Sequence, residues 1–252
     1  MTRKLIACAL VLLAGAALAH AGEFPGKATY LFYINGKYAG KSVIKTKVTA
    51  KSVVFESTSK LAWDEYAHDF ACVTEVDKES LGPRRFTFDG VKMKKRFFGS
   101  IEVRKDSAFA DFHLDEAKYS SKSYIGPKAA FVEGYVPEHA MVLARILMGT
   151  EDPYFRFTTF LPSDFMTAST LALMESEAIV PATPPLACRK YSISPQNSGA
   201  YLMFVDPKTA RLVYMAFPTS RTEVFLVEAF GEEPTPIFQP LEDLEAQGEE
   251  DE

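Results

Sequence analysis

Apolar and polar residues alternate along much of residues 41–114, which is the period expected of β-strands with one buried face. In residues 53–63, for example, Phe55 and Glu56 fall on opposite faces. The turn-forming pairs between the runs include Asn35-Gly36, Asp89-Gly90, Gly99-Ser100 and Lys105-Asp106. Short alternating strands joined by tight turns predict an antiparallel sheet built as a meander.

Four other segments are apolar on both faces. The first is residues 29–40, TYLFYINGKYAG, in which five apolar or aromatic residues run into the Asn35-Gly36 turn. The others lie late in the chain, at residues 201–205, 212–215 and 224–227. Strands of this kind need cover on both sides. We therefore expect these segments to lie close to one another, with a helix, a second strand layer or a ligand over the second face.

Residues 136–149, VPEHAMVLARILMG, break the two-residue period and predict a helix. Pro137 suits the first helical position, and Gly149 suits the position just after the last turn. The helix is apolar nearly all round, so it should be buried on most sides. Its polar exceptions are Glu138, His139 and Arg145. Together these elements predict a mainly β fold: a curled antiparallel sheet, or half-barrel, with one buried apolar helix across the opening.

The two ends of the chain differ from this middle part. Residues 1–21 are typical of a secretory signal peptide that ends at Ala19-His20-Ala21, and an uncleaved anchor is the alternative. Residues 231–252 hold nine acidic residues and no basic ones, which is typical of a disordered acidic tail. The alternative for the tail is that Pro236-Ile237-Phe238 docks onto another surface. We expect a single β-rich domain at 22–230, in a soluble protein exported to a bacterial periplasm.

The formal net charge of −5 comes from the acidic tail, and the remaining domain is close to neutral. We therefore expect no nucleic-acid partner. Arg84-Arg85 and the basic residues within 92–96 form a modest cluster, which a solvated strand face explains more simply than contact with anionic lipid or a partner. Beyond the signal peptide, the chain has no apolar segment long enough to span a bilayer, so we do not expect an integral membrane protein.

Two stretches carry a resemblance to known proteins. They are YLFYINGKYAGKSVIK near the start and CRKYSIS…AYLMFVDPKTARLVYMAF near the end. In order and pattern, residues 26–230 resemble exported bacterial proteins of unknown function that share the half-barrel of the outer-membrane lipoprotein carriers (the LolA/LolB type). The resemblance implies a curved sheet around a hydrophobic cavity, which in the carriers holds acyl chains. It carries over no individual functional residue, and the chain lacks the lipid-anchor cysteine of some relatives.

Sequence motifs typical of catalytic sites are scarce. The sequence has no nucleophile elbow, Walker loop or dinucleotide-binding motif, and the histidines beyond the signal peptide lack the spacing of metal ligands. His68-Asp69 beside Asp64 and Glu65 is the densest polar group. A polar loop explains it more simply than a weak metal site or an acid/base pair. We expect no catalytic residue, no metal and no cofactor.

Cys72 and Cys188 are the two cysteines left after removal of the signal peptide, and an exported protein meets an oxidising compartment. We predict a disulfide between them. A buried free thiol is the alternative for Cys72, because that residue shares a strand face with Phe70 and Val76.

Aromatic residues are the positive functional indication, with 20 Phe and 11 Tyr against one Trp. Plain core packing accounts for most of them, and the excess favours a lined pocket. Our leading hypothesis is a periplasmic, non-catalytic protein that binds a hydrophobic ligand, lipid or acyl chain in the half-barrel. The residues expected at the cavity or its lid are Tyr30, Phe32, Ile34, Met141, Leu143 and Leu147. The alternatives are an envelope protein–protein interaction module with a filled core, and a hydrolase of unknown substrate built near His68.

Overall fold

The structure is a computed structural model that describes residues 24–63, 66–92, 94–150, 152–161, 166–180, 185–196 and 199–240. The predicted signal peptide and residues 241–252 lie outside the described residues. The strands are β1 (Lys27–Ile34), β2 (Lys37–Val48), β3 (Ser52–Trp63), β4 (Tyr66–Asp77), β5 (Pro83–Lys92), β6 (Lys95–Arg104), β7 (Ser107–Leu114), β8 (Ala117–Tyr124), β9 (Ala129–Phe131), β10 (Tyr154–Leu161), β11 (Met166–Val180), β12 (Leu186–Pro195), β13 (Tyr201–Val205), β14 (Leu212–Phe217) and β15 (Thr222–Leu226). The helices are α2 (Pro137–Met148), the 3₁₀ turn η1 (Pro218–Ser220) and α3 (Val227–Phe230).

In the described part of the chain, the strands form one sheet in the order β8-β7-β6-β5-β4-β3-β2-β1-β15-β14-β13-β12-β11-β10-β9. The first and last strands of the chain meet in the middle of this sheet, where β1 pairs with β15. Each described pair is antiparallel except β9–β10, which is parallel. The meander explains this order, because each tight turn places the next strand beside the previous one.

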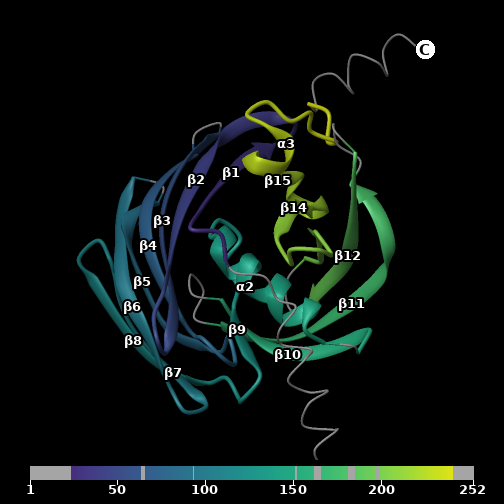
Figure 1. The fold of residues 1–252 in the computed structure, drawn as a ribbon. Coiled ribbons are helices and arrows are strands. Elements are labelled where there is room, and N and C mark those ends of the chain that lie inside the picture. Colours follow the sequence, from purple (N-terminus) through teal and green to yellow (C-terminus); the bar gives the residue numbers. More distant parts are fainter. Residues whose placement is uncertain are drawn as a thin grey trace, which may run out of the picture.

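The sheet curls around α2 and does not close, as Figure 1 shows. Helix α2 begins at Pro137 and ends against Gly149, whose backbone N–H donates to the carbonyl oxygen of Arg145 at 3.0 Å. Most of its residues are buried. The predicted mainly β half-barrel with a buried apolar helix is therefore confirmed. The finer likeness to the lipoprotein carriers remains a proposal.

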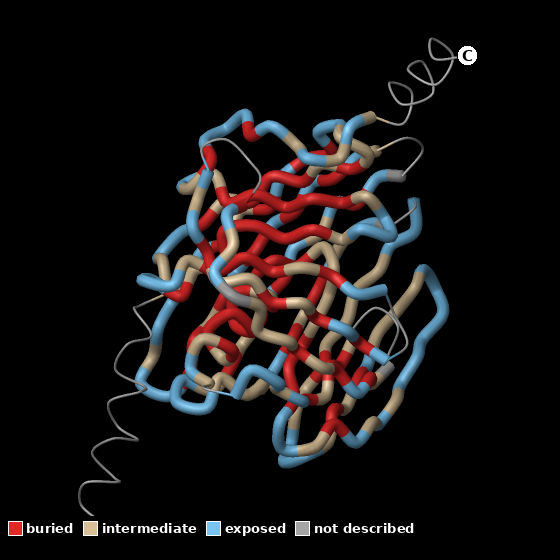
Figure 2. The backbone as a smooth tube through the Cα atoms, turned by 90° about the vertical axis from the view of Figure 1, so that its right-hand side faces the viewer, coloured by how far each residue is buried: buried red, intermediate tan, exposed pale blue. Residues whose placement is uncertain are grey.

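Two hydrophobic clusters make up the core. The main cluster packs β1–β3 and β12–β15 against α2 on the inner face and against α3 on the outer face. The second lies where the two ends of the sheet come together, because β9 contacts β5 and β8 contacts β11. Figure 2 shows buried runs through the middle of the molecule and exposed residues mainly at the turns. The curl thus produces a filled centre and a separate packing seam between the sheet ends.

The strands that are apolar on both faces receive their second cover from the end of the chain. Tyr30 faces α2, whereas Tyr33 faces outward and contacts Phe225, with ring centres 5.6 Å apart. Phe225 in turn packs edge-on against Phe230 of α3 at 5.5 Å. Residues 231–240, here called the C-terminal strap, continue this cover. The backbone N–H groups of Ile237 and Phe238 donate hydrogen bonds to the buried carboxylate of Glu223. Packing and hydrogen bonds therefore extend beyond Phe230.

Candidate functional site

Helix α2 fills the interior that the sequence predicts to be a cavity. The six residues expected at the cavity or its lid are all buried, and all belong to the main core cluster: Tyr30, Phe32, Ile34, Met141, Leu143 and Leu147. Beside the helix, Tyr30 and Met141 line a hollow of about 10 Å³. A space this small holds about one water molecule. The structure therefore brings the predicted residues together as packed core around the helix.

The first turn of α2 carries two buried polar side chains. Ser57 Oγ of β3 donates to Glu138 Oε1 at 2.5 Å, and the Thr74 hydroxyl of β4 lies 3.2 Å from His139 Nε2. Burial raises the pKa of Glu138 from 4.5 to about 7 and lowers the pKa of His139 from 6.5 to about 3. At neutral pH His139 is therefore uncharged and Glu138 only partly ionised, and their contacts with β3 and β4 fix the start of the helix.

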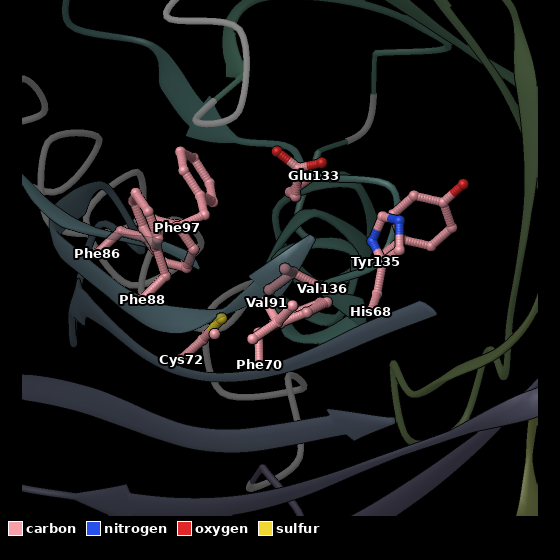
Figure 3. A pocket seen from close by; sticks show the side chains of 11 residues that line it. His68, Phe70, Cys72, Phe86, Phe88, Val91, Phe97, Glu133, Tyr135 and Val136 are labelled. Atoms are coloured by element: carbon pink, nitrogen blue, oxygen red, sulfur yellow. The ribbon is translucent and has the colours of Figure 1, made fainter. Parts of the chain in front are cut away.

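An aromatic pocket lies beside this helix start, on the inner face of β4–β6 (Figure 3). Its volume is about 50 Å³. Glu133 and Tyr135 face Phe88 and Phe97 across it, and Cys72 lies at its base. The full lining is His68, Phe70, Cys72, Phe86, Phe88, Gly90, Val91, Phe97, Glu133, Tyr135 and Val136. The pocket is much smaller than the roughly 300–1,000 Å³ that ligand sites usually have.

The aromatic walls of this pocket pack against one another. Phe88 stacks on Phe97 with ring centres 4.4 Å apart, and Phe97 meets Phe112 at 5.7 Å. Phe112 stacks on Tyr119 of the edge strand β8 at 4.8 Å. The row needs a glycine at position 99, because a Cβ there would lie 2.5 Å from the Phe112 Cβ. The rings therefore use most of their contact surface on each other, as in the joint between two packed layers.

The polar group predicted near His68 is divided by the sheet. His68 is buried between Trp63 and Tyr135, with ring centres 5.0 Å and 5.3 Å away. Asp69 follows it in β4, points to the opposite face and pairs with Lys60 at 3.5 Å. Asp64 and Glu65 lie outside the described residues. The acid/base pair considered for His68 and Asp69 is therefore not formed, since neighbouring strand residues face opposite sides.

A larger groove lies where several strands of the sheet end, between β12, the β13–β14 turn and α3. Its volume is about 630 Å³, within the range of small-molecule sites. Its apolar lining comes from β12, β14, β15, the β13–β14 turn and α3: Leu186, Ala187, Cys188, Pro207, Val213, Leu226 and Ala229. Its charged lining is Glu177, Asp206, Lys208, Arg211 and Glu228. The groove thus combines an apolar surface with charges of both signs.

The β13–β14 turn sets the positions of the two basic side chains of the groove. Asp206 Oδ1 accepts the backbone N–H of Lys208 at 2.9 Å, and its Oδ2 accepts the hydroxyl of Thr209 at 2.6 Å. The turn is closed by the Asp206 N–H, which donates to the Arg211 carbonyl oxygen at 2.9 Å. The Asp206 carboxylate is therefore engaged in holding the turn. Lys208 is exposed and Arg211 half-buried at the rim.

The inner end of the groove reaches α2. Arg211 and Leu226 line both the groove and the small hollow beside Tyr30 and Met141. Arg145 of α2 lines the same hollow, and its guanidinium lies 4.0 Å from the centre of the Phe24 ring. Two of the six predicted residues are thus placed next to the groove. The sequence did not indicate that the groove residues lie together, because they come from separate strands, the β13–β14 turn and α3, which only the fold brings side by side.

The predicted disulfide is wrong: Cys72 and Cys188 are both free, buried thiols. Cys72 lies on β4 in the seam cluster, and Cys188 lies on β12 in the main cluster. Along the sheet, the six strands β3, β2, β1, β15, β14 and β13 separate them. Burial raises the pKa of Cys188 to about 11, with a contribution from Asp206.

Among the described residues, no group of three side chains is placed to hold a metal ion.

Comparisons with known proteins add little to this geometry. No protein-family model matches the chain, and no curated protein matches it. A crystal structure of a DUF1089 family protein from Pseudomonas aeruginosa is similar over 68% of this chain and 87% of that one, with a TM-score of 0.43 and 7% identity. A similarity this distant carries no argument about function. In the described part of the chain, none of the helices has the length and apolar character needed to cross a bilayer.

Proposed function

We propose that this protein is a non-catalytic binding protein for a hydrophobic ligand, such as a lipid or acyl chain, and that the groove beside α3 is the binding site. One observation carries the proposal. The groove has the volume of a ligand site, about 630 Å³, and combines an apolar lining with charged groups. The aromatic pocket is far smaller, and its rings are already stacked on one another.

Apolar burial supplies the driving force in this proposal. Removing apolar surface from water stabilises a complex by about 25 cal/mol per Å². The half-buried Leu186 and Ala229 and the exposed Pro207 offer such a surface, whereas Val213 and Leu226 form the covered floor beneath it. Part of the gain offsets the loss of ligand motion on binding. A ligand with an apolar body and a polar end matches this lining better than a purely apolar one.

The cellular setting is part of the same proposal. Residues 1–21 have the features of a signal peptide, so we propose export and a periplasmic location. The curled sheet around α2 supports the likeness to lipoprotein carriers, whose half-barrels hold acyl chains. In those carriers the ligand lies inside the barrel. In this chain α2 occupies that space, so the proposed ligand lies at the open end instead.

The filled core favours a second candidate. Two hollows against α2 hold only about 10 Å³ each and the aromatic pocket beside its start about 50 Å³, as expected for a scaffold that displays its surface to another protein. An envelope protein–protein interaction module is therefore the alternative function. It differs from the first proposal in needing no bound small molecule.

The test uses the full exported chain, purified under mild conditions without detergent. Native mass spectrometry and lipid extraction should detect a co-purifying ligand, and the neutral probe N-phenyl-1-naphthylamine should bind saturably. Leu186→Trp fills the groove and should weaken probe binding about tenfold. Val48→Trp, at a site 50% exposed on β2 and away from the groove lining, is the matched control and should bind normally. Absence of both a co-purifying ligand and saturable probe binding would overturn the proposal.

A further inference from the structure

We propose that the C-terminal strap, residues 231–240, is the gate of the groove: the docked strap holds α3 in place as one wall, and release of the strap opens that wall to ligand. The inference rests on the proposed function and describes the regulation of the same site. Helix α3 links the two, because Glu228 and Ala229 line the groove and the strap begins directly after Phe230. In Figure 1, α3 and the yellow segment that follows it lie beside β1 and β15.

Helix α3 is too short to hold its position alone. It is a single turn of four residues, in which the Gly231 N–H donates to the Val227 carbonyl oxygen at 2.7 Å. Helices of this length are not stable by themselves in water. Its packing on the sheet comes from Phe230, which is buried and meets the Phe225 ring edge-on. The position of α3 therefore depends on how the chain is held on both sides of it, by β15 before it and by the strap after it.

The strap is anchored at its far end, at the start of β15. The buried Glu223 carboxylate accepts the backbone N–H groups of Ile237 and Phe238, at 2.9 Å and 3.0 Å. The Arg221 guanidinium donates to the Gln239 carbonyl oxygen at 2.5 Å and lies 5.3 Å from the centre of the Phe238 ring. Each of these hydrogen bonds involves a charged group, which makes it stronger than a neutral one.

The β1–β2 turn fits closely against this anchor. A Cβ at Gly36 would clash with the Phe238 carbonyl oxygen and would lie 2.8 Å from the Pro240 nitrogen. The Asn35 N–H donates to the Arg221 carbonyl oxygen at 3.0 Å, which ties the turn to the same anchor. The sheet thus presents a shaped site for the end of the strap.

Between α3 and the anchor, the strap combines a hinge with a stiff segment. Residues 231–233 are exposed, and Gly231 has a φ of +82° with no atom within 4 Å of the place that a Cβ would take. Pro234, Pro236 and Pro240 follow, and each fixes its own φ. A stiff segment held at one end limits movement at the other. Loss of the anchor therefore frees Gly231 to turn and α3 to leave the sheet.

Opening of this wall would give a ligand more apolar surface. With α3 docked, Val213 and Leu226 form the covered floor of the groove, and Phe230 covers Phe225. Movement of α3 uncovers part of this surface, which an entering ligand buries again. The strap should therefore control how fast a ligand enters and leaves more than how tightly it binds.

The test measures the rates of N-phenyl-1-naphthylamine binding and release by stopped-flow fluorescence, with the full exported chain. Glu223→Ala removes the acceptor that holds the strap and should raise both rates about tenfold, while Kd changes less than about threefold. Phe238→Ala removes only the ring beside Arg221 and should raise both rates by a smaller factor. Thr235→Ala, at an exposed site of the same strap, is the matched control and should keep the wild-type rates.

Hydrogen exchange supplies a readout that needs no ligand. The Gly231 amide closes the turn of α3, so it should exchange faster in Glu223→Ala than in Thr235→Ala. Wild-type exchange of this amide in Glu223→Ala would overturn the inference, because α3 would then stay docked without the anchor.

The kinetic outcomes separate the two proposals. If both rates keep their wild-type values in Glu223→Ala and Phe238→Ala, the gate is overturned and hydrophobic binding stands. If the release rate alone rises, the strap is a fixed part of the wall, and the gate is overturned as well. If the wild-type protein binds no probe, the proposed function fails and the gate fails with it. Circular dichroism checks the fold of Glu223→Ala, and Phe238→Ala decides the test if that variant does not fold.

Discussion

The aromatic pocket and the groove beside α3 are both hollows with apolar walls, yet they differ in room and in polarity. The pocket holds about 50 Å³ and is enclosed by rings that stack on each other. The groove holds about 630 Å³ and mixes aliphatic side chains with charges of both signs. The pocket lies at the seam where the sheet ends meet, and the groove lies where strand ends and a short helix leave a gap.

This difference shows why apolar character alone is a poor guide to a binding site. The rings of Phe88 and Phe97 stack on each other, so removing either ring leaves an empty space in a packed layer. Leu186 and Val213 have no comparable stacking and border a space of ligand size. Volume and the nearby charges therefore identify the groove as the better candidate.

The test with the largest expected effect replaces one residue of the aromatic pocket and one residue of the groove. Phe86 is 2% exposed and contacts Phe131 and His139, so Phe86→Ala should lower the free energy of unfolding by about 3–5 kcal/mol. Leu186→Ala, at a half-buried site, should cost clearly less. Urea denaturation measures both changes. The comparison breaks if Phe86→Ala weakens probe binding more than Leu186→Ala does, because the ligand would then occupy the aromatic pocket.

A second test uses the pH dependence of stability, which we expect to arise from Glu138 and His139 beside the aromatic pocket. The folded-state pKa of Glu138 is raised from 4.5 to about 7, so its contribution is complete below pH 4.5 and is lost as the pH rises through 7. The folded-state pKa of His139 is lowered from 6.5 to about 3, so its contribution is complete above pH 6.5 and is lost as the pH falls through 3. The two effects oppose each other between pH 5 and 7, and the wild-type protein should change little there.

Single substitutions separate these opposing effects. Glu138→Gln leaves His139 alone, and its unfolding free energy should fall by about 2 kcal/mol from pH 7 to pH 5. His139→Phe leaves Glu138 alone and should show the reverse slope, with a similar loss from pH 5 to pH 8. Chemical denaturation across this pH range measures both. Parallel slopes in the two variants would contradict the burial of these groups beside the pocket.

The smallest expected effect concerns the C-terminal strap, which covers the outer face of β15. Glu223 is fully buried and accepts the backbone N–H groups of Ile237 and Phe238 and the hydroxyl of Tyr214. Glu223→Ala should release the C-terminal strap and lower the unfolding free energy by about 1–2 kcal/mol, because the freed N–H groups return to water while the buried Tyr214 hydroxyl loses its acceptor. Limited proteolysis should then cut residues 231–240 faster. Glu223→Gln, which keeps an acceptor oxygen, is the control and should be cut more slowly than Glu223→Ala.

Much of the architecture could be predicted from local pattern. Alternation in residues 41–114 and the turn at Asn35-Gly36 were sufficient for an antiparallel meander, and Pro137 and Gly149 were sufficient for the bounds of α2. The sites were harder to predict. Tyr30 and Met141 were expected in a cavity, but the side chains of α2 fill that space. Pattern reports which face of an element is apolar, whereas the remaining volume depends on how well the opposing faces fit.

By itself, the sequence determined that β1, β14 and β15 need cover on both faces, because their residues are apolar on both. Only the tertiary structure decided what covers them: α2 on the inner face, and α3 with the strap on the outer face. The same holds for the groove, whose lining comes from β11, β12, β14, β15, the β13–β14 turn and α3. The spacing of residues along the chain fixes the period of each strand. The separation of Cys72 from Cys188, and the meeting of Arg145 with Arg211, depend on the curl of the whole sheet.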